Sequence, residues 1–425
     1  MIKIFDEKDT ANVFDRPLCD TSEYEKTVSQ IIDKVIKEKD KALFEFAEKF
    51  DNVKLDTLEV TAEEMDEAEK LVDTKLKKTI KQAAENIAEF HSRQLEKGFE
   101  IKKENGIVLG QKVTPLDRVG IYVPGGTACY PSTVLMNAVP AKIAGVGEII
   151  MVTPPRKDKT ILPEVLYAAK VAGVDRIFKI GGAGAVAALA YGTESVPAVD
   201  KITGPGNIYV ATAKKMVYGK VAIDMIAGPS EILVIADSGA KPEVVAADLL
   251  SQAEHDRLAS AVLITDSPDL AKSVQSQIEV QLNKLSRKEI ARASVDNMSK
   301  IIVVSDLKKG VEIANEIAPE HLELMVANPF DYLCEVKHAG SIFMGYNTPE
   351  PLGDYYAGPN HTLPTSGTAK FSSPLNALDY VKRSSYIYYS EDALRQVKDD
   401  VISFAQSEGL TAHANSVAIR FSEEK

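Results

Sequence analysis

The alternation of short apolar runs with alanine-rich segments is the feature that most constrains how this chain folds. From Arg118 onward, apolar runs begin near residues 120, 148, 176, 201 and 231, with helical segments between them. A second series of runs begins near residues 260, 300 and 341. Alternating strands and helices fold into parallel sheets with helices on both faces. The sequence therefore predicts an α/β protein with two Rossmann-like parallel-sheet domains, neither carrying a complete dinucleotide fingerprint.

The expected domain boundaries follow the changes in this rhythm. Residues 1–17 are short and mixed in character, and we expect a small N-terminal arm there. Residues 18–120 and 236–375 are expected to form a first, discontinuous α/β domain, and residues 121–235 a second one. Beyond residue 375 the alternation is lost, so residues 376–425 are expected to form a separate C-terminal element of a strand followed by helices.

Two helices are predicted before the alternation begins. Apolar residues recur at helical spacing from Val28 to Ile36, so one face of that helix is buried. Thr61 and Glu64 have the spacing of a capping box, and a long charged helix is expected from there to about Gln94. Its mixture of Glu and Lys, with His91, indicates a solvated face.

Composition excludes several classes of protein. The 425 residues include 45% apolar and 26% charged residues, and the net charge of −12 argues against a nucleic-acid binder. The three cysteines, at positions 19, 129 and 334, form no CxxC motif, which fits a reducing cytoplasm. The first ten residues contain no apolar signal-peptide core. Polar residues interrupt the longest apolar run, residues 134–152, so no membrane span is expected.

A segment rich in glycine and proline, Gly353–Thr365, contains both Asp354 and His361. Such a composition is typical of a loop, and loops on a rigid scaffold often carry catalytic side chains. An ordinary surface turn, with a capping Asp and a solvated His, has the same composition.

A possible metal site lies at the end of a predicted helix, residues 242–255. Gln252 and His255 are three residues apart and therefore share a face. The spacing is that of a Glu-x-x-His metal motif, but Gln is not a usual zinc ligand. Asp354 and His413 would complete a nitrogen and oxygen set without a thiolate. Spacing alone leaves open whether these residues converge.

An acid and an imidazole stand side by side at Glu320 and His321. The pair offers two proton acceptors with different ordinary pKa values, which suits acid–base catalysis. Adjacent residues of a strand point apart, so a shared substrate requires them at the end of an element, as Pro319 indicates. An exposed pair that begins a buried strand is the competing interpretation.

Two glycine-rich segments, GGAG at Gly181–Gly184 and GPGN at Gly204–Asn207, lie between predicted strands and helices. Backbone amides and a helix dipole at such a junction can receive phosphate. Neither segment matches G-x-G-x-x-G, and neither is followed by an acid about twenty residues later.

Taken together, these motifs resemble those of the histidinol dehydrogenase family. The resemblance is carried by RVGIYVPGG, GPGNIYV, AGPSEILVIAD, SQAEHD, APEHLEL, GDYYAGPNHTLPT and GLTAHANSV, in that order along nearly the whole chain. It implies oxidation of L-histidinol to L-histidine through L-histidinal, with NAD and one Zn²⁺ per subunit. It also implies a homodimer in which residues 376–425 reach the partner's site. The first domain would then hold zinc and the catalytic residues, and the second would bind NAD.

The resemblance also assigns roles to individual residues. Glu320 and His321 would be the catalytic acid–base pair. The zinc ligands would be Gln252, His255, Asp354 and His413. Substrate would contact those four residues together with His321, Ser230, His361 and Glu408. NAD would contact Tyr122, Asn207 and the segment around Gly184; the family often has Gln at that last position, so the glycine puts a polar contact with the cofactor in question.

Other functions remain open at this point. A relative on the same scaffold that oxidises another polar alcohol would share most of these motifs, and a zinc hydrolase would use the metal to activate water. A binding module without turnover fits poorly with so many titratable residues in glycine-rich loops.

Overall fold

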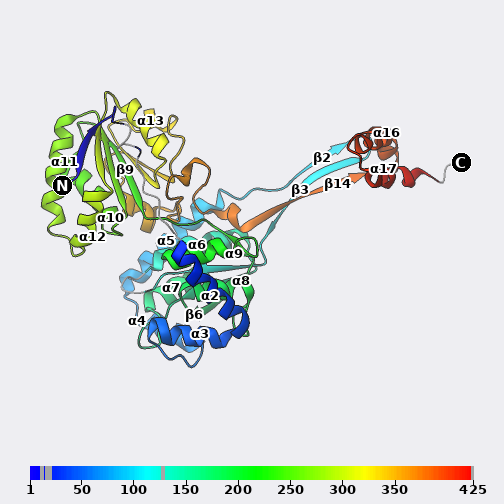
Figure 1. The fold of residues 1–425 in the computed structure, drawn as a ribbon, viewed down its shortest axis with the longest axis horizontal. Helices are drawn as coiled ribbons and strands as arrows, with labels where there is room; N and C mark the ends of the chain where they lie inside the picture. The colour runs from blue at the N-terminus through cyan, green and yellow to red at the C-terminus, as the bar shows by residue number, and fades with distance from the viewer. Residues whose placement is uncertain (10–13, 15–21, 126–129, 423–425) are drawn as a thin grey trace. The chain divides into compact units, whose positions relative to one another are not determined.

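The computed structural model describes residues 1–9, 14, 22–125 and 130–422. The chain divides into two compact units. Unit 1 comprises residues 1–94 and 116–380, and unit 2 comprises residues 95–115 and 381–425. The predicted α/β class is confirmed, because unit 1 is built on two parallel sheets covered by helices (Figure 1).

The first sheet of unit 1 has, within the described part of the chain, five parallel strands in the order β6-β5-β4-β7-β8. These strands are β4 (Arg118–Tyr122), β5 (Glu148–Thr153), β6 (Arg176–Lys179), β7 (Lys201–Thr203) and β8 (Ala222–Ile223). The connecting helices are α6 (Pro131–Ala144), α7 (Pro163–Ala172), α8 (Gly182–Tyr191) and α9 (Ile208–Val217). The continuous apolar run of β5 is buried, as expected for a parallel sheet covered on both faces.

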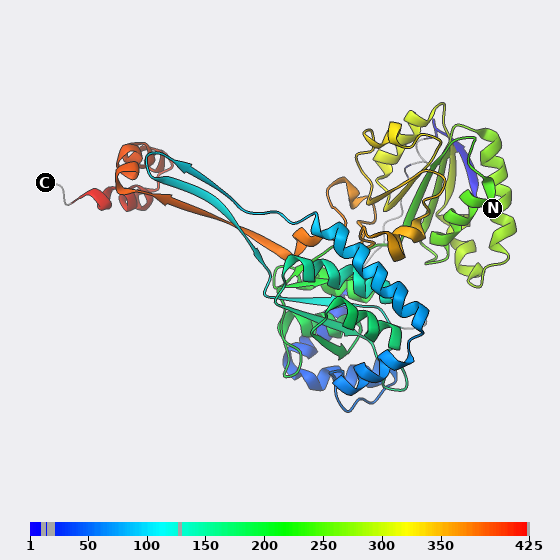
Figure 2. The ribbon, with the colours of Figure 1, turned by 180° about the vertical axis from the view of Figure 1, so that it is seen from behind.

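The N-terminal helices pack on this first sheet. They are α2 (Ser22–Glu38), α3 (Asp40–Phe46), the π-helical turn η1 (Ala47–Asp51), α4 (Ala62–Leu71) and α5 (Thr74–Ser92). Helix α2 packs against α8 and α9 and buries Val28, Ile32 and Val35 in their core. Helix α4 packs on α7, and α5 lies along α6 and α7 (Figure 2).

This packing differs from the expected grouping of residues 18–120 with residues 236–375. The apolar period of a helix predicts that one face is buried but does not identify the surface that buries it. The capping box at Thr61 and Glu64 is confirmed. The long helix predicted after it is two helices, because Val72 is extended and the Asp73 side chain caps a new start. His91 was predicted on a solvated face and is buried, with Nδ1 2.7 Å from Oε1 of Gln94.

The second sheet of unit 1 has six parallel strands over the described residues, in the order β1-β11-β10-β9-β12-β13. They are β1 (Lys3–Asp6), β9 (Glu231–Ala236), β10 (Ser260–Thr265), β11 (Lys300–Val303), β12 (His321–Met325) and β13 (Ser341–Met344). The helices are α10 (Pro242–Ala253), α11 (Pro268–Leu282), α12 (Lys288–Asn297), α13 (Leu307–Ile317), α14 (Phe330–Leu333) and α15 (Glu350–Leu352). Helices α10–α12 share a core with one face, and α13 shares a core with the other.

Two expected boundaries change at this sheet. Residues 3–6 of the predicted arm form an edge strand paired with β11, whereas residues 10–13 and 15–17 lie outside the described residues. The run that begins at Glu231 was grouped with the preceding domain. It forms β9, which pairs with both β10 and β12 inside the second sheet. A buried strand has the same apolar sequence pattern in either sheet, because the pattern does not identify the strands that pair with it.

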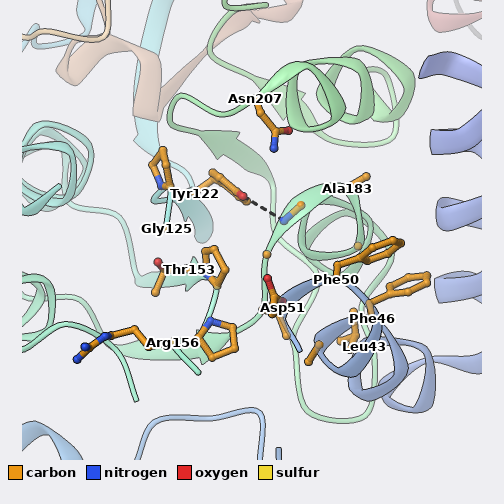
Figure 3. A pocket seen from close by; sticks show the side chains of 18 of the residues that line it. Leu43, Phe46, Phe50, Asp51, Tyr122, Gly125, Thr153, Arg156, Ala183 and Asn207 are labelled. Atoms are coloured by element: carbon orange, nitrogen blue, oxygen red, sulfur yellow. Dashed lines mark hydrogen bonds between the residues drawn. The ribbon is translucent and has the colours of Figure 1, made fainter. Parts of the chain in front are cut away.

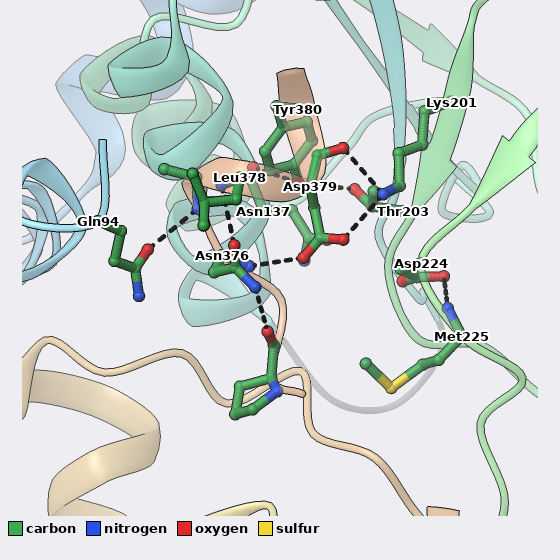
Figure 4. A network of polar contacts seen from close by, with 12 residues as sticks. Gln94, Asn137, Lys201, Thr203, Asp224, Met225, Asn376, Leu378, Asp379 and Tyr380 are labelled. Atoms are coloured by element: carbon green, nitrogen blue, oxygen red, sulfur yellow. Dashed lines mark hydrogen bonds and ion pairs between the residues drawn. The ribbon is translucent and has the colours of Figure 1, made fainter. Parts of the chain in front are cut away.

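Tyr380, at the end of the 3-10 turn η4 (Ala377–Tyr380), is the last residue of the second segment of unit 1. Buried polar contacts hold it in place (Figure 4). Its hydroxyl donates to the carbonyl oxygen of Asn137 at 2.9 Å and lies 3.1 Å from Oγ1 of Thr203. Nζ of Lys201 donates to Oδ1 of Asp379 at 3.0 Å. The amide of Ala377 donates to Gln94, the last residue before the chain first leaves unit 1. The chain leaves unit 1 after Gln94 and again after Tyr380, and one network of polar contacts therefore holds both of these points.

Unit 2 is a three-stranded antiparallel sheet with a helical hairpin, as counted over its described residues. Its elements are β2 (Phe99–Lys103), β3 (Ile107–Pro115), β14 (Val381–Tyr389), α16 (Glu391–Ser407), α17 (Thr411–Ala418) and the turn η5 (Ile419–Phe421). The strand and helices predicted after residue 375 are present, but they do not form a separate element. Residues 376–380 belong to unit 1, and β2 and β3, which were grouped with the first domain, complete the sheet of β14. Large apolar side chains on unit 2 are exposed, including Ile387 at 75% and Phe404 at 72%. None of the described helices is long and apolar enough to cross a membrane.

Candidate active site

Glu320 and His321 lie at the amino end of β12, both buried. Oε2 of Glu320 accepts a hydrogen bond from the amide of Glu231 at 2.9 Å, and Nδ1 of His321 lies 2.9 Å from the carbonyl oxygen of Glu231. Glu320 precedes the first residue of the strand, as the prediction of a pair at an element's end requires. Because a carbonyl oxygen only accepts, Nδ1 carries the proton and Nε2 of the neutral ring is free to accept one.

The Nε2 side of His321 faces carboxylates from the segment after β13. Nε2 lies 3.8 Å from Oδ1 of Asp354 and 4.0 Å from Oε1 of Glu350. The candidate ligand atoms of these three residues all lie within 4.8 Å of one another. Asp354 was expected in a loop and lies in a π-helical turn, η2 (Gly353–Ala357), whose carbonyl at Asp354 is 3.1 Å from Nδ1 of His361. Asp354, His361 and His321 are therefore brought together.

Gln252 is 1% exposed in the last turn of α10. Within the described chain, neither its Oε1 nor its Nε2 has a hydrogen-bond partner, and neither does Nε2 of His321. The helix ends at Ala253, earlier than predicted, and His255 lies in the turn that follows, with its amide bonded to the carbonyl of Gln252 at 3.0 Å. Burial lowers the pKa of His255, and the charge of Asp354 acts in the opposite direction. His255 therefore lies within electrostatic range of Asp354.

The remaining predicted residues are divided between the two units. Ser230 is half-buried and directly precedes Glu231, the residue that holds both Glu320 and His321. Glu408 follows the end of α16 and His413 lies on α17, both exposed and both in unit 2. These observations place Ser230 at the edge of the sheet that carries the acid–base pair.

The electrostatics of the site are dominated by buried carboxyl groups. Burial raises the pKa of Glu320 to about 7. Burial acts to lower the pKa of His321, but Glu320, Asp354 and Glu350 together raise it to about 10. Burial also opposes ionisation of Asp354, yet its interactions with His321 and His361 lower its pKa to about 2. The imidazole and Asp354 thus stabilise each other's charged form.

Sequence reasoning missed three buried acids beside this site: Glu350, Glu323 and Asp248. The amide of Glu350 donates to Oε1 of Glu323 at 2.8 Å, and the hydroxyl of Ser251 donates to Oε2 of Glu350 at 3.2 Å. Burial raises the pKa of Glu350 to about 8 and that of Asp248 to about 6. The available signals were spacings: Glu350 is four residues before Asp354, and Asp248 is four before Gln252. Such spacings place side chains on one face of a helix.

A pocket of about 1040 Å³ lies at the carboxyl edge of the first sheet. All three residues predicted to contact the cofactor, Tyr122, Gly184 and Asn207, line it. Figure 3 shows Tyr122 and Asn207 at this pocket. The hydroxyl of Tyr122 accepts from the amide of Gly182, at the start of α8, at 3.0 Å. Asn207 caps α9 through its Oδ1. Burial raises the pKa of Asp51, also in the wall, to about 6.

The two candidate sites use opposite edges of their sheets. The pocket follows the general rule for open α/β sheets, since ligands bind there beyond the carboxyl ends of strands. Ser230, Glu320 and His321 instead precede or begin β9 and β12, at the amino ends of the second sheet. The rule that ligands bind at the carboxyl ends of strands therefore predicts the position of the pocket, but it does not predict the position of Glu320 and His321.

Comparison with known proteins agrees with these features. The sequence model of the family described as histidinol dehydrogenase matches residues 14–421. The chain is 58% identical over 402 residues to histidinol dehydrogenase from Clostridium acetobutylicum, covering 95% of this chain and 93% of the relative. It is 54% identical over 400 residues to that of Listeria monocytogenes, covering 94% and 93%.

A solved structure of the same family is also similar. The crystal structure of histidinol dehydrogenase from Elizabethkingia anophelis has a TM-score of 0.94 with this chain at 37% sequence identity. The likeness covers 99% of this chain and 98% of that one. From the extent of the family match and the identity to its curated relatives, this chain belongs to the histidinol dehydrogenase family.

Proposed function

We propose that this chain oxidises L-histidinol to L-histidine through L-histidinal, with NAD as hydride acceptor and zinc as the bound metal. The observation that carries the proposal is the convergence of Glu320, His321 and Asp354 at one edge of the second sheet. Such an oxidation needs a base for the alcohol proton and a second group that activates water. Family membership supplies the substrate, because the relatives are histidinol dehydrogenases.

The residues present fit a divalent metal. Buried polar atoms without a partner are costly, and the described chain leaves the amide of Gln252 and Nε2 of His321 in that condition. The surrounding donors are nitrogen and oxygen, a set that suits zinc among other metals. Zinc would be held by Gln252, His255, Asp354 and His413 of the partner subunit, and would supply a positive charge that orients the substrate's amine and imidazole.

The pocket of the first sheet fits a dinucleotide. Its volume is at the upper end of the range for small-molecule and cofactor sites. Helix α8 begins at Gly182 in the wall of the pocket, and phosphate is favoured near the positive end of a helix dipole. NAD bound there would accept hydride. Tyr122 and Asn207 would hold it from the carboxyl ends of β4 and β7.

The protein's own groups move the protons. Glu231 fixes the proton of His321 on Nδ1, so Nε2 takes the alcohol proton as hydride leaves the carbon. A cation held by Asp354 would place positive charge beside His321 and so would lower the pKa of this imidazole, which favours its role as a base. Glu320, whose pKa of about 7 suits either direction of transfer, takes a proton from the water that adds to the aldehyde. The proton held by His321 would pass to the aldehyde oxygen as water adds, which returns the imidazole to its neutral form. The hydrate would then give its hydride to a second NAD and a hydroxyl proton to Nε2 of His321, so that the carboxylic acid forms.

We further propose that the site is shared between two subunits of a cytoplasmic homodimer. Glu408 and His413 are exposed in unit 2, as groups available to another chain would be. Large exposed apolar side chains on the same unit, among them Phe404 at 72% and Ile419 at 60%, are typical of an interaction surface. A two-fold dimer would form two equivalent sites, each with Glu408 and His413 of the partner subunit.

The test is metal dependence of L-histidinol oxidation. NADH formation is followed by absorbance with L-histidinol, with other amino alcohols and with ester substrates of hydrolases. The proposal predicts NADH from L-histidinol, loss of activity on chelation, and loss of both metal and turnover in His255→Ala. Undiminished oxidation by protein shown to be metal-free by elemental analysis would contradict the metal assignment, and hydrolysis without NADH would favour a zinc hydrolase.

A further inference from the structure

Gly184 lies in the wall of the pocket, on α8, where a side chain has no room. A Cβ atom at this position would lie 2.8 Å from Cδ2 of Phe46 and 3.8 Å from Cδ2 of Leu43. Carbon atoms in well-packed interiors stay about 3.5 Å or more apart. The absence of a side chain at Gly184 and the position of the Phe46 ring therefore depend on each other.

Phe46 is held where it is by neighbours on its other sides. Its ring centroid lies 5.5 Å from that of Phe50, at a tilt of 34°, and Nζ of Lys34 lies 5.9 Å from the ring centroid. The ring also packs against the core of α2, α3 and α8. A ring displaced from this position would lose these contacts.

Glycine within a helix lowers helix stability, because it loses more backbone freedom on folding than alanine does. A helical glycine is therefore informative where another group approaches closely. Gly184 is buried, in the first turn of α8, and its backbone has no positive φ that would require glycine. The close approach of the Phe46 ring is thus the feature that excludes a side chain at this position.

We propose that Gly184 and Phe46 form a matched pair that determines the dinucleotide affinity of this pocket. Without a side chain at Gly184, the wall offers the ligand no side-chain hydrogen bond at this position. It offers an apolar surface formed by Phe46, Phe50 and Leu43 (Figure 3). Planar heterocycles gain free energy by packing against such a surface. The inference rests on the proposed function, because it takes the occupant to be NAD.

The pair is tested by a double-mutant cycle with two readouts. The proteins are wild type, Gly184→Gln, Phe46→Ala and the double variant. Titration of NADH fluorescence measures binding, and thermal unfolding without ligand measures stability. Gly184→Gln introduces an overlap with Phe46, so we expect NADH binding about tenfold weaker and a lower Tm. Phe46→Ala removes apolar contact and should weaken binding less. In the double variant the glutamine takes the room of the ring, so binding and Tm should be at least as high as in Gly184→Gln alone.

The outcomes separate this inference from the proposed function. Additive losses in both readouts, or Gly184→Gln with unchanged NADH binding, would overturn the matched pair. Wild type that binds no NADH would overturn both the cofactor assignment and this inference. If Gly184→Gln fails to fold, Gly184→Ala carries the same test, because the Cβ alone makes the overlap. Phe330→Ala, an aromatic residue of unit 1 that is 75% exposed and outside the pocket, serves as the control and should change neither readout.

Discussion

The carbonyl oxygen of Glu231 lies 2.9 Å from Nδ1 of His321, and the amide of Glu231 donates to the carboxylate of Glu320 at the same distance. One residue of β9 thus fixes both members of the proposed acid–base pair. The contact assigns the proton of the neutral imidazole to Nδ1 and leaves Nε2 as the acceptor. Because backbone atoms of Glu231 make both contacts, their geometry follows from the pairing of β9 with β12.

The two half-reactions should respond differently to substitution of this pair. Glu320→Gln keeps the acceptor oxygen that Glu231 binds but removes the base for water, so we expect it to slow oxidation of added L-histidinal far more than the first hydride transfer. His321→Asn should slow both steps. Single-turnover measurements with L-histidinol and with L-histidinal give the rates of the two steps separately for each variant. Equal losses in both steps for Glu320→Gln would mean that the two roles are not separate.

Glu350 should matter for metal binding even though the sequence did not identify it. Its Oε1 lies 4.0 Å from Nε2 of His321, and its candidate ligand atom lies within 4.8 Å of those of His321 and Asp354. Glu350→Gln removes the charge and retains the size, and residues beside metal ligands typically contribute about tenfold or more to affinity or activity. We expect lower metal content and lower turnover. Glu243→Gln, on the exposed first turn of α10, is the matched control, and a Glu350 variant that behaves like it would exclude this role.

Asp51 should make stability depend on pH. Burial raises the pKa of its carboxyl from 3.8 to about 6 in the folded protein. Ionisation of Asp51 therefore lowers the free energy of unfolding, with the full effect above pH 6. The effect disappears below pH 3.8, where the carboxyl is protonated in both the folded and the unfolded chain. Asp51→Asn should therefore raise the free energy of unfolding at neutral pH by at most about 2 kcal/mol after allowance for solvent screening.

Denaturant unfolding of wild type and Asp51→Asn between pH 5 and 8 measures this difference. The difference in free energy of unfolding between the two proteins should increase as pH rises to about 7 and stay constant above that pH. The exposed Asp331→Asn should show no such difference. A difference independent of pH would show that the effect of Asp51→Asn does not arise from ionisation of this carboxyl.

The sequence predicted the architecture where the chain's local pattern determines it. The apolar runs predicted β4 to β7, β9 to β11 and β13, though not β1, β8 or β12. Thr61 with Glu64 predicted a capping box that the structure confirms. Pro319 correctly indicated that Glu320 and His321 stand at the start of an element. These features depend on neighbours within a few residues, which a single sequence displays.

Long-range partners were not predictable in the same way. The edge strand Lys3–Asp6 pairs with residues almost three hundred positions away, and the helices of residues 22–92 pack on the first sheet instead of the second. Glu350 and Asp248 were missed because each becomes part of the site only when β12, α10 and the segment after β13 come together. An isolated acid in a sequence is far more often a solvated surface residue.

The shared-site proposal makes a quantitative prediction for mixed subunits. His321→Asn and His413→Ala, each inactive alone, are refolded together at equal amounts. If each site combines the two subunits, a mixed dimer has one doubly damaged and one intact site. Random pairing makes about half the dimers mixed, so roughly a quarter of wild-type activity should return. Absence of recovery despite demonstrated subunit exchange would show that His321 and His413 act within one chain.

The central claim is that this chain carries L-histidinol through both oxidation steps. The most direct measurement is the ratio of NADH formed to L-histidinol consumed at complete conversion, with the product identified by mass spectrometry. The account predicts two NADH for each L-histidinol and L-histidine as the product, with no free L-histidinal accumulating. One NADH for each L-histidinol with release of the aldehyde, or no NADH at all, would contradict it.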